Sequence, residues 1–98
     1  MSESFAVPVC TACGHAIWPP RPLCPRCGCT SFEQRAVTTG VIEEWTAGAE
    51  HSLASVRTQA GPVAIARLVR EAPAGTTVEL CWDRAPDRDA ALVATPRD

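Results

Sequence analysis

The chain has 98 residues, of which 46% are hydrophobic and 20% charged, and its formal net charge is −2. A chain of this length forms one small domain, or a domain with a smaller appendage, and its hydrophobic core alone would be marginal. The acidic balance argues against a dedicated nucleic-acid module, and the absence of lysine excludes Schiff-base chemistry. No apolar run approaches the roughly 18 residues of a membrane span, and the N-terminus does not resemble a secretion signal, so we expect a cytoplasmic protein.

Four of the six cysteines form two matching motifs near the N-terminus. Cys10–Gly14 and Cys24–Gly28 both have the pattern Cys-x2-Cys-Gly, and ten residues lie between Cys13 and Cys24. Zn²⁺ prefers four thiolates in a tetrahedron, and two intervening residues let one tight turn direct both sulfurs inward. A glycine after each pair is typical of a backbone with positive φ. These motifs predict one zinc ion with four ligands: Cys10, Cys13, Cys24 and Cys27.

The predicted zinc site is structural and not catalytic. A catalytic zinc keeps one coordination position open, whereas four cysteines close the site. The metal would supply folding free energy that a core of this size lacks. Arg21 and Arg26 lie within or beside the motifs and would offset part of the negative charge of the thiolates.

The remaining cysteines and the two histidines are weaker candidates. Cys29 follows the second motif, where it is expected to be a bystander, although an exchange with Cys27 is an alternative. Cys81 alternates with apolar residues and is expected to fill the core. His15, next to the first motif, is a minor alternative ligand, and His51 lies in a loop with no nucleophile or carboxylate set around it. The sequence therefore predicts no catalytic residues.

The composition changes at about residue 32 to short runs rich in Val, Ile, Thr and Trp, separated by Gly, Pro and Asp. These runs predict five strands, at about 35–46, 52–59, 62–70, 76–83 and 90–95. Ala60–Pro62 is typical of a hairpin turn, and Gly40 predicts a bulge or bend in the first strand. No window shows a convincing helical period. The pattern predicts an all-β body, as a small barrel or a sandwich.

The tryptophans and arginines of this region have structural interpretations. Trp45 and Trp82 alternate with aliphatic residues and are expected in the core, whereas Trp18, beside two prolines, is expected to be exposed and available to a partner. Three arginines could gather on neighbouring strands, either on a solvated sheet face, which we favour, or as a phosphate site: Arg57, Arg67 and Arg70.

The chain resembles the zinc-ribbon plus OB-fold proteins often called DUF35. The resemblance rests on the two cysteine motifs, the intervening Pro19–Arg21, the strand Gly40–Thr46, and the later segments Val63–Val69 and Thr77–Trp82. It implies an all-β fold with an N-terminal, rubredoxin-like zinc ribbon over residues 1–31 and a five-stranded OB-fold barrel over residues 32–98.

Members of this family accompany thiolase-like condensing or cleaving enzymes and aldolases. The resemblance therefore implies a non-catalytic accessory subunit in lipid metabolism, which binds and stabilises such an enzyme acting on acyl-CoA and contributes to acyl-CoA binding. One alternative is an OB-fold module for single-stranded nucleic acid, which would need a positive groove lined with stacking aromatics. Another is an independent enzyme acting on acyl-CoA thioesters. The three Trp, two Phe and acidic charge disfavour the first, and the missing nucleophile–base set disfavours the second.

Overall fold

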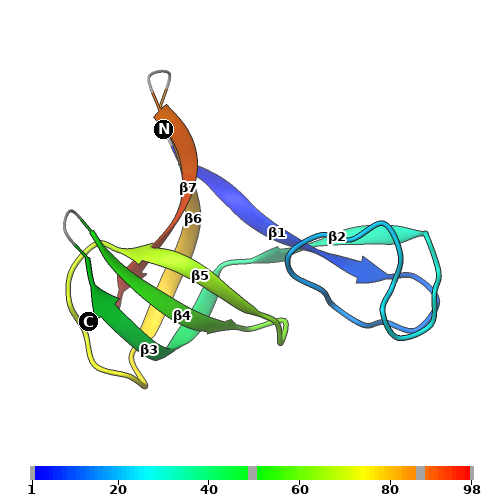
Figure 1. Cartoon of the computed structure of the whole chain (residues 1–98), viewed down its shortest axis with the longest axis horizontal. Coiled ribbons are helices and arrows are strands. Elements are labelled where there is room, and N and C mark those ends of the chain that lie inside the picture. The colour runs from blue at the N-terminus through cyan, green and yellow to red at the C-terminus, as the bar shows by residue number, and fades with distance from the viewer. Residues whose placement is uncertain (1, 49–50, 86–87, 98) are drawn as a thin grey trace.

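The computed structural model describes residues 2–48, 51–85 and 88–97, and these residues form seven β-strands and no helix (Figure 1). The strands are β1 (Ser2–Cys10), β2 (Phe32–Val37), β3 (Thr39–Ala47), β4 (Ser52–Thr58), β5 (Val63–Leu68), β6 (Thr77–Ala85) and β7 (Arg88–Pro96). The all-β class predicted from the sequence is confirmed. The described residues hold no helix that is long and apolar enough to cross a membrane.

Five of the strands close into a barrel. They follow one another in the order β6-β3-β4-β5-β7, and β7 pairs with β6 to complete the circuit. All neighbours are antiparallel except β5 and β7, which pair in parallel through Arg67↔Val93 and Leu68↔Ala94. A five-stranded, partly open Greek-key barrel is an OB-fold, and here the short pairing between β5 and β7 is the open side. The predicted five-stranded barrel is therefore confirmed.

The first predicted strand is divided into two strands that belong to different parts of the molecule. β2 and β3 flank Thr38; β2 pairs with β1 over the whole register from Phe5↔Val37 to Cys10↔Phe32, whereas β3 enters the barrel. In Figure 1 the β1–β2 ladder extends from the barrel and carries the looped segment between these strands at its far end. The prediction of one strand over residues 35–46 was therefore wrong. Consecutive apolar runs do not reveal that the chain changes from one strand partner to another.

β1 was not predicted from the sequence. Its first residues pair with β6, from Ser2↔Asp83 to Ser4↔Cys81, before it pairs with β2. Pro8 ordinarily argues against a strand because it donates no backbone hydrogen bond. Here Pro8 lies in the part of β1 where β2 is the one strand partner among the described residues, so the missing donor disrupts no second ladder.

Gly40 has a different role from the one expected. The bulge between β3 and β4 lies at Ile42–Glu44, two residues beyond Gly40. A Cβ atom at Gly40 would lie 2.5 Å from Val56 Cγ1 and 2.8 Å from the carbonyl oxygen of Arg57. Glycine is therefore required because β3 and β4 approach closely here.

The hydrophobic core is continuous from the barrel into β1. Phe5 and Val7 belong to the same buried cluster as barrel residues such as Val56 and Val78. Trp18, which was expected to be exposed, is instead half-buried against this cluster, and its ring centroid lies 4.8 Å from that of Phe5 in an edge-on contact. Trp82 completes the group, 5.7 Å from Phe5. These aromatic contacts fix the segment after the first cysteine motif against the barrel.

Two further core expectations hold only in part. Trp45 and Trp82 pack against the core but remain half-buried. Cys81 is also half-buried, because it follows the inward-facing Leu80 and lies on the other face of β6.

Candidate metal centre

The two cysteine motifs fold into equivalent turns beyond the end of the β1–β2 ladder. In the first turn the Gly14 N–H donates to the Cys10 carbonyl at 2.9 Å, and in the second the Gly28 N–H donates to the Cys24 carbonyl at 2.8 Å. Gly14 has a φ of +77° and Gly28 a φ of +80°, as the sequence motif predicted. Side chains are strained in this region of φ, so glycine allows each turn to close.

The turns bring four thiols into one cluster. The Sγ atoms of Cys10, Cys13, Cys24 and Cys27 all lie within 4.8 Å of one another. Cys10 Sγ lies 3.5 Å from Cys27 Sγ, and Cys13 Sγ lies 3.7 Å from Cys24 Sγ. A tetrahedral ion with bonds of about 2.3 Å to sulfur requires neighbouring sulfurs about 3.8 Å apart. The cluster therefore has the geometry of a metal site with four thiolate ligands.

The two motifs contribute one buried and one exposed thiol each. Cys10 and Cys24, the first cysteine of each motif, are buried, whereas Cys13 and Cys27 are exposed. Backbone hydrogen bonds hold the buried pair: the Cys10 N–H donates to the His15 carbonyl and the Cys24 N–H to the Cys29 carbonyl, both at 2.9 Å. One side of the cluster therefore faces the protein and the other faces solvent.

Backbone donors and the neighbouring sulfurs set the protonation of the thiols. The backbone N–H of Cys13 stabilises the Cys10 thiolate and, against the effect of burial, lowers the pKa of Cys10 from 9.0 to about 6. Burial opposes ionisation of Cys24, but donors from Cys27 and Arg26 outweigh it and lower the pKa of Cys24. Although the backbone of Cys29 favours the Cys27 thiolate, the sulfur of Cys10 and burial raise the pKa of Cys27 to about 12. The cluster therefore favours ionisation of the first cysteine of each motif over that of the second.

The other candidate residues lie outside this four-sulfur cluster. Cys29 Sγ accepts a hydrogen bond from the Ser31 N–H at 3.4 Å. His15 is half-buried and its carbonyl accepts from Cys10, while its ring is not among the clustered ligand groups of the described residues. His51 is exposed beside β4, and Cys81 is in the barrel. The structure therefore brings the four predicted ligands together. It places neither of the alternative ligands, His15 and Cys29, in the same cluster.

The arginines of the barrel have separate surroundings. Arg57 Nε donates to Glu43 Oε2 at 2.8 Å, forming an ion pair on the outer surface. Arg70 donates to the Pro96 carbonyl at 3.1 Å. Arg57 and Arg70 therefore do not converge on a common anion site.

Two features that the fold creates were not predicted from the sequence. A cleft of about 400 Å³ separates the metal-binding loops from the β4–β5 turn, lined on one side by His15 and Arg26 and on the other by Ala60–Pro62. A second hollow lies on the outer surface of the barrel beside Leu53 and Ile65. Both depend on residues distant in sequence, so no local motif indicates them.

Comparison with known proteins finds one match to the ribbon alone and one to the ribbon and barrel together. Residues 2–33 match the family described as "ChsH2, rubredoxin-like zinc ribbon domain". A solved structure titled "Ltp2-ChsH2(DUF35) aldolase" is similar with a TM-score of 0.78 and 24% identity, covering 95% of this chain and 84% of that chain. At this identity the structural likeness establishes the fold. No curated protein matches the sequence significantly. The predicted resemblance is therefore supported by the family match over the ribbon and by the likeness in fold over most of the chain.

Proposed function

We propose that this chain is a DUF35-type protein and a non-catalytic accessory subunit, which binds and stabilises a thiolase-like enzyme or an aldolase acting on acyl-CoA. The observation that carries the proposal is the likeness, over 95% of the chain, to a structure whose title names an Ltp2-ChsH2(DUF35) aldolase. The catalytic residues would belong to the partner, and a contribution of this chain to acyl-CoA binding is part of the same proposal.

In this proposal Cys10, Cys13, Cys24 and Cys27 hold one structural Zn²⁺. The sulfur–sulfur distances of 3.5 and 3.7 Å suit its tetrahedral coordination. Zinc bound there supplies a cross-link between the two cysteine turns. The four cysteines fix the loops, and the contact of Trp18 with Phe5 fixes the loops against the barrel. The subunit would thus present its ribbon and its barrel to the enzyme in a fixed relative orientation.

The surface chemistry of the barrel does not favour the nucleic-acid alternative. OB-folds bind oligonucleotides on the face built around their second and third strands, which here are β4 and β5. That face carries Leu53 and Ile65 where stacking aromatics would be required. A protein partner suits such a surface better than a single strand does.

Co-expression with each thiolase-like enzyme and aldolase of the same organism tests the proposal. We expect the metal-loaded chain and the enzyme to co-elute in gel filtration and the pair to be more thermostable than the enzyme alone. The isolated chain should not turn over acyl-CoA thioesters. A folded, metal-loaded chain that elutes apart from the enzyme at about 10 µM of each, well above the affinity of a stable complex, would contradict the proposal.

A further inference from the structure

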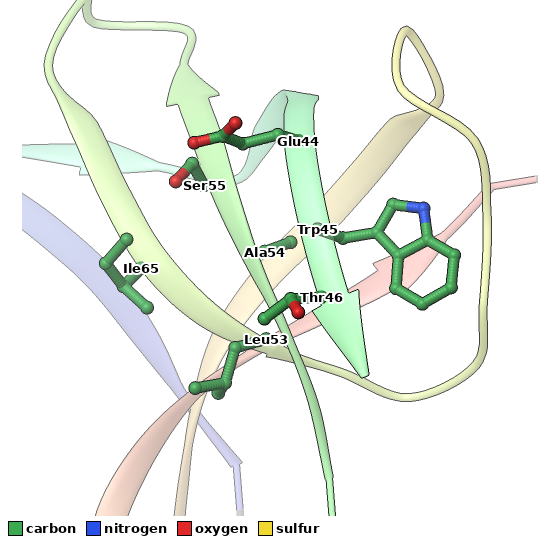
Figure 2. A pocket seen from close by; sticks show the side chains of 7 residues that line it. All are labelled: Glu44, Trp45, Thr46, Leu53, Ala54, Ser55 and Ile65. Atoms are coloured by element: carbon green, nitrogen blue, oxygen red, sulfur yellow. The ribbon is translucent and has the colours of Figure 1, made fainter. Parts of the chain in front are cut away.

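One edge of β2 is open to a further strand. β2 is the first strand in the sheet order, and β1 is its one strand partner among the described residues. The second edge of β1 is occupied, first by β6 and then by a bridge to Ala16. β4 of the barrel also pairs on both edges, and Figure 2 shows Leu53 and Ser55 between the strands that carry Trp45 and Ile65. We call the unpaired side of β2 the β2 edge.

The hydrogen bonds of β1 identify which backbone groups lie along the β2 edge. The Pro8 carbonyl accepts from the Ile17 N–H at 3.0 Å, and the Cys10 N–H donates to the His15 carbonyl at 2.9 Å. The backbone groups of Pro8 and Cys10 therefore face away from β2, and this direction alternates along both strands of an antiparallel pair. The residues of β2 that face outward in turn are those opposite Cys10, Pro8 and Ala6: Phe32, Gln34 and Ala36.

The β2 edge lacks the features that commonly prevent the addition of a strand. β2 contains no proline or glycine, and its register with β1 runs without a bulge. Gln34 and Ala36 are exposed, and in the described part of the chain their outward backbone groups have no hydrogen-bond partner. An edge of this kind is a template for pairing with another chain.

Two opposite charges alternate with the outward residues of the edge. Glu33 and Arg35 are both exposed, and they lie on the same face of the sheet because they are two residues apart. Within the residues that the structure describes, neither side chain forms an ion pair or a hydrogen bond. The nearby charges Arg57 and Glu43, in contrast, are paired with each other.

We propose that the β2 edge pairs with the β2 edge of a second copy of this chain, in an antiparallel and two-fold symmetric dimer. Outward residues must lie opposite outward residues to exchange backbone hydrogen bonds, so the register can change only in steps of two residues. Two neighbouring registers place Glu33 opposite itself or Arg35 opposite itself, and like charges directly opposite are destabilising. The register between them places Gln34 opposite Gln34 of the other copy.

In this register the charges are complementary. Glu33 of each copy lies opposite Arg35 of the other, at a position where no backbone bonds intervene and the Cα atoms are about 4.5 Å apart. The half-buried Phe32 lies opposite the small side chain of Ala36. The two-fold axis repeats each of these pairs, as a symmetric interface requires. The pattern of the edge therefore fits a second copy of the same strand.

The length of β2 limits the strength of the dimer. Its six residues span about 20 Å, and one added strand lies about 4.8 Å away. Contact along a single strand buries less than the 800 Å² or so on each partner that a typical stable complex buries. The dimer is therefore weak, and it forms and dissociates over concentrations of about 10 µM to 1 mM.

Sedimentation equilibrium of the metal-loaded full chain over this concentration range tests the proposal without any partner enzyme. The wild-type protein should change from monomer to dimer. Gln34→Pro should weaken the dimer at least tenfold, because it removes an outward N–H and none of the bonds between β1 and β2. Gln34→Ala is the matched control, since it changes the same side chain and retains the N–H. It should leave the association within about twofold of the wild type.

A charge exchange tests the register directly and does not depend on the proline variant. Glu33→Arg or Arg35→Glu alone should each weaken the dimer about threefold to tenfold, because both symmetric pairs become repulsive. The double variant should recover the wild-type association, with circular dichroism and metal content confirming the fold of every variant. A chain that stays monomeric throughout the range overturns the proposal. A dimer that a folded Gln34→Pro variant does not weaken, or a double variant without recovery, overturns it equally.

Discussion

The metal-binding loops and the barrel are stabilised in different ways. Between residues 11 and 31 the buried hydrophobic side chains are Ile17 and Cys24, and Cys24 is itself a proposed metal ligand. The barrel and β1 instead share a continuous buried cluster that includes Phe5, Ile42 and Val56. The comparison indicates that the loops depend on a metal for their structure, whereas the barrel depends on apolar burial.

The junction between the two regions uses a third kind of contact. Trp18 from the loops, Phe5 from β1 and Trp82 from β6 form a compact aromatic group. Because these residues come from both regions, damage at the junction should loosen the loops without dissolving the barrel.

The largest effect is expected for Cys24→Ser. Structural zinc contributes on the order of 10 kcal/mol to the folding of small domains, so loss of one of four thiolates should unfold the loops. Metal content should fall well below one ion per chain, and amide NMR signals of residues 11–31 should collapse to random-coil positions while barrel signals persist. Cys29→Ser is the control, since Cys29 lies outside the cluster, and it should retain the metal. Full metal content in Cys24→Ser would contradict the ligand assignment.

The next largest effect is expected for Phe5→Ala. Phe5 is fully buried and contacts both Trp18 and Trp82. Its truncation should reduce the free energy of unfolding by about 3–5 kcal/mol, measured by urea denaturation. Val69→Ala, at a 59% exposed position, should change it by less than about 0.5 kcal/mol. Similar losses in the two variants would show that the core does not extend into β1.

A smaller effect is expected for Gly40→Ala. The added Cβ would meet the Val56 side chain and the Arg57 carbonyl, so β3 and β4 must separate slightly. We expect a loss of about 1–3 kcal/mol in the free energy of unfolding, with the metal retained. Gly75→Ala changes a glycine with a φ of +94° and open space around it, so it tests strain without a clash. A neutral Gly40→Ala would refute the close approach of the strands.

The smallest effect on stability is expected for Arg57→Gln. This change removes the ion pair with Glu43. The side chain of Arg57 is 57% exposed and that of Glu43 is 38% exposed. The loss should be no more than about 1 kcal/mol and should shrink at high salt. Thermal unfolding at low and high ionic strength measures both. A loss that does not depend on salt would indicate that the packing of the arginine stem, or its hydrogen bond to the Gly61 carbonyl, is the cause.

Much of the metal site could be predicted from the sequence, because its geometry is local. Each Cys-x2-Cys-Gly turn directs two sulfurs inward, and the positive φ of Gly14 and Gly28 was expected from the motif alone. The strands at 52–58 and 63–68 were also close to the predicted ranges, because their inward residues alternate with outward ones. β1 was missed because Pro8 interrupts its pattern, and the division at Thr38 was missed because it depends on which strand pairs with which.

The sequence by itself determined the four-thiol turns, the β-rich body and the tight β4–β5 connection, since each follows from the conformational preferences of a few neighbouring residues. The tertiary structure decided that Trp18 packs beside Phe5, that Gly40 permits two strands to approach, and that Glu44 and Arg67 share a face with Leu53 and Ile65. These relations join residues far apart along the chain. They exist only once barrel closure has set the register, because a shift of one residue would turn every side chain of a strand to the opposite face.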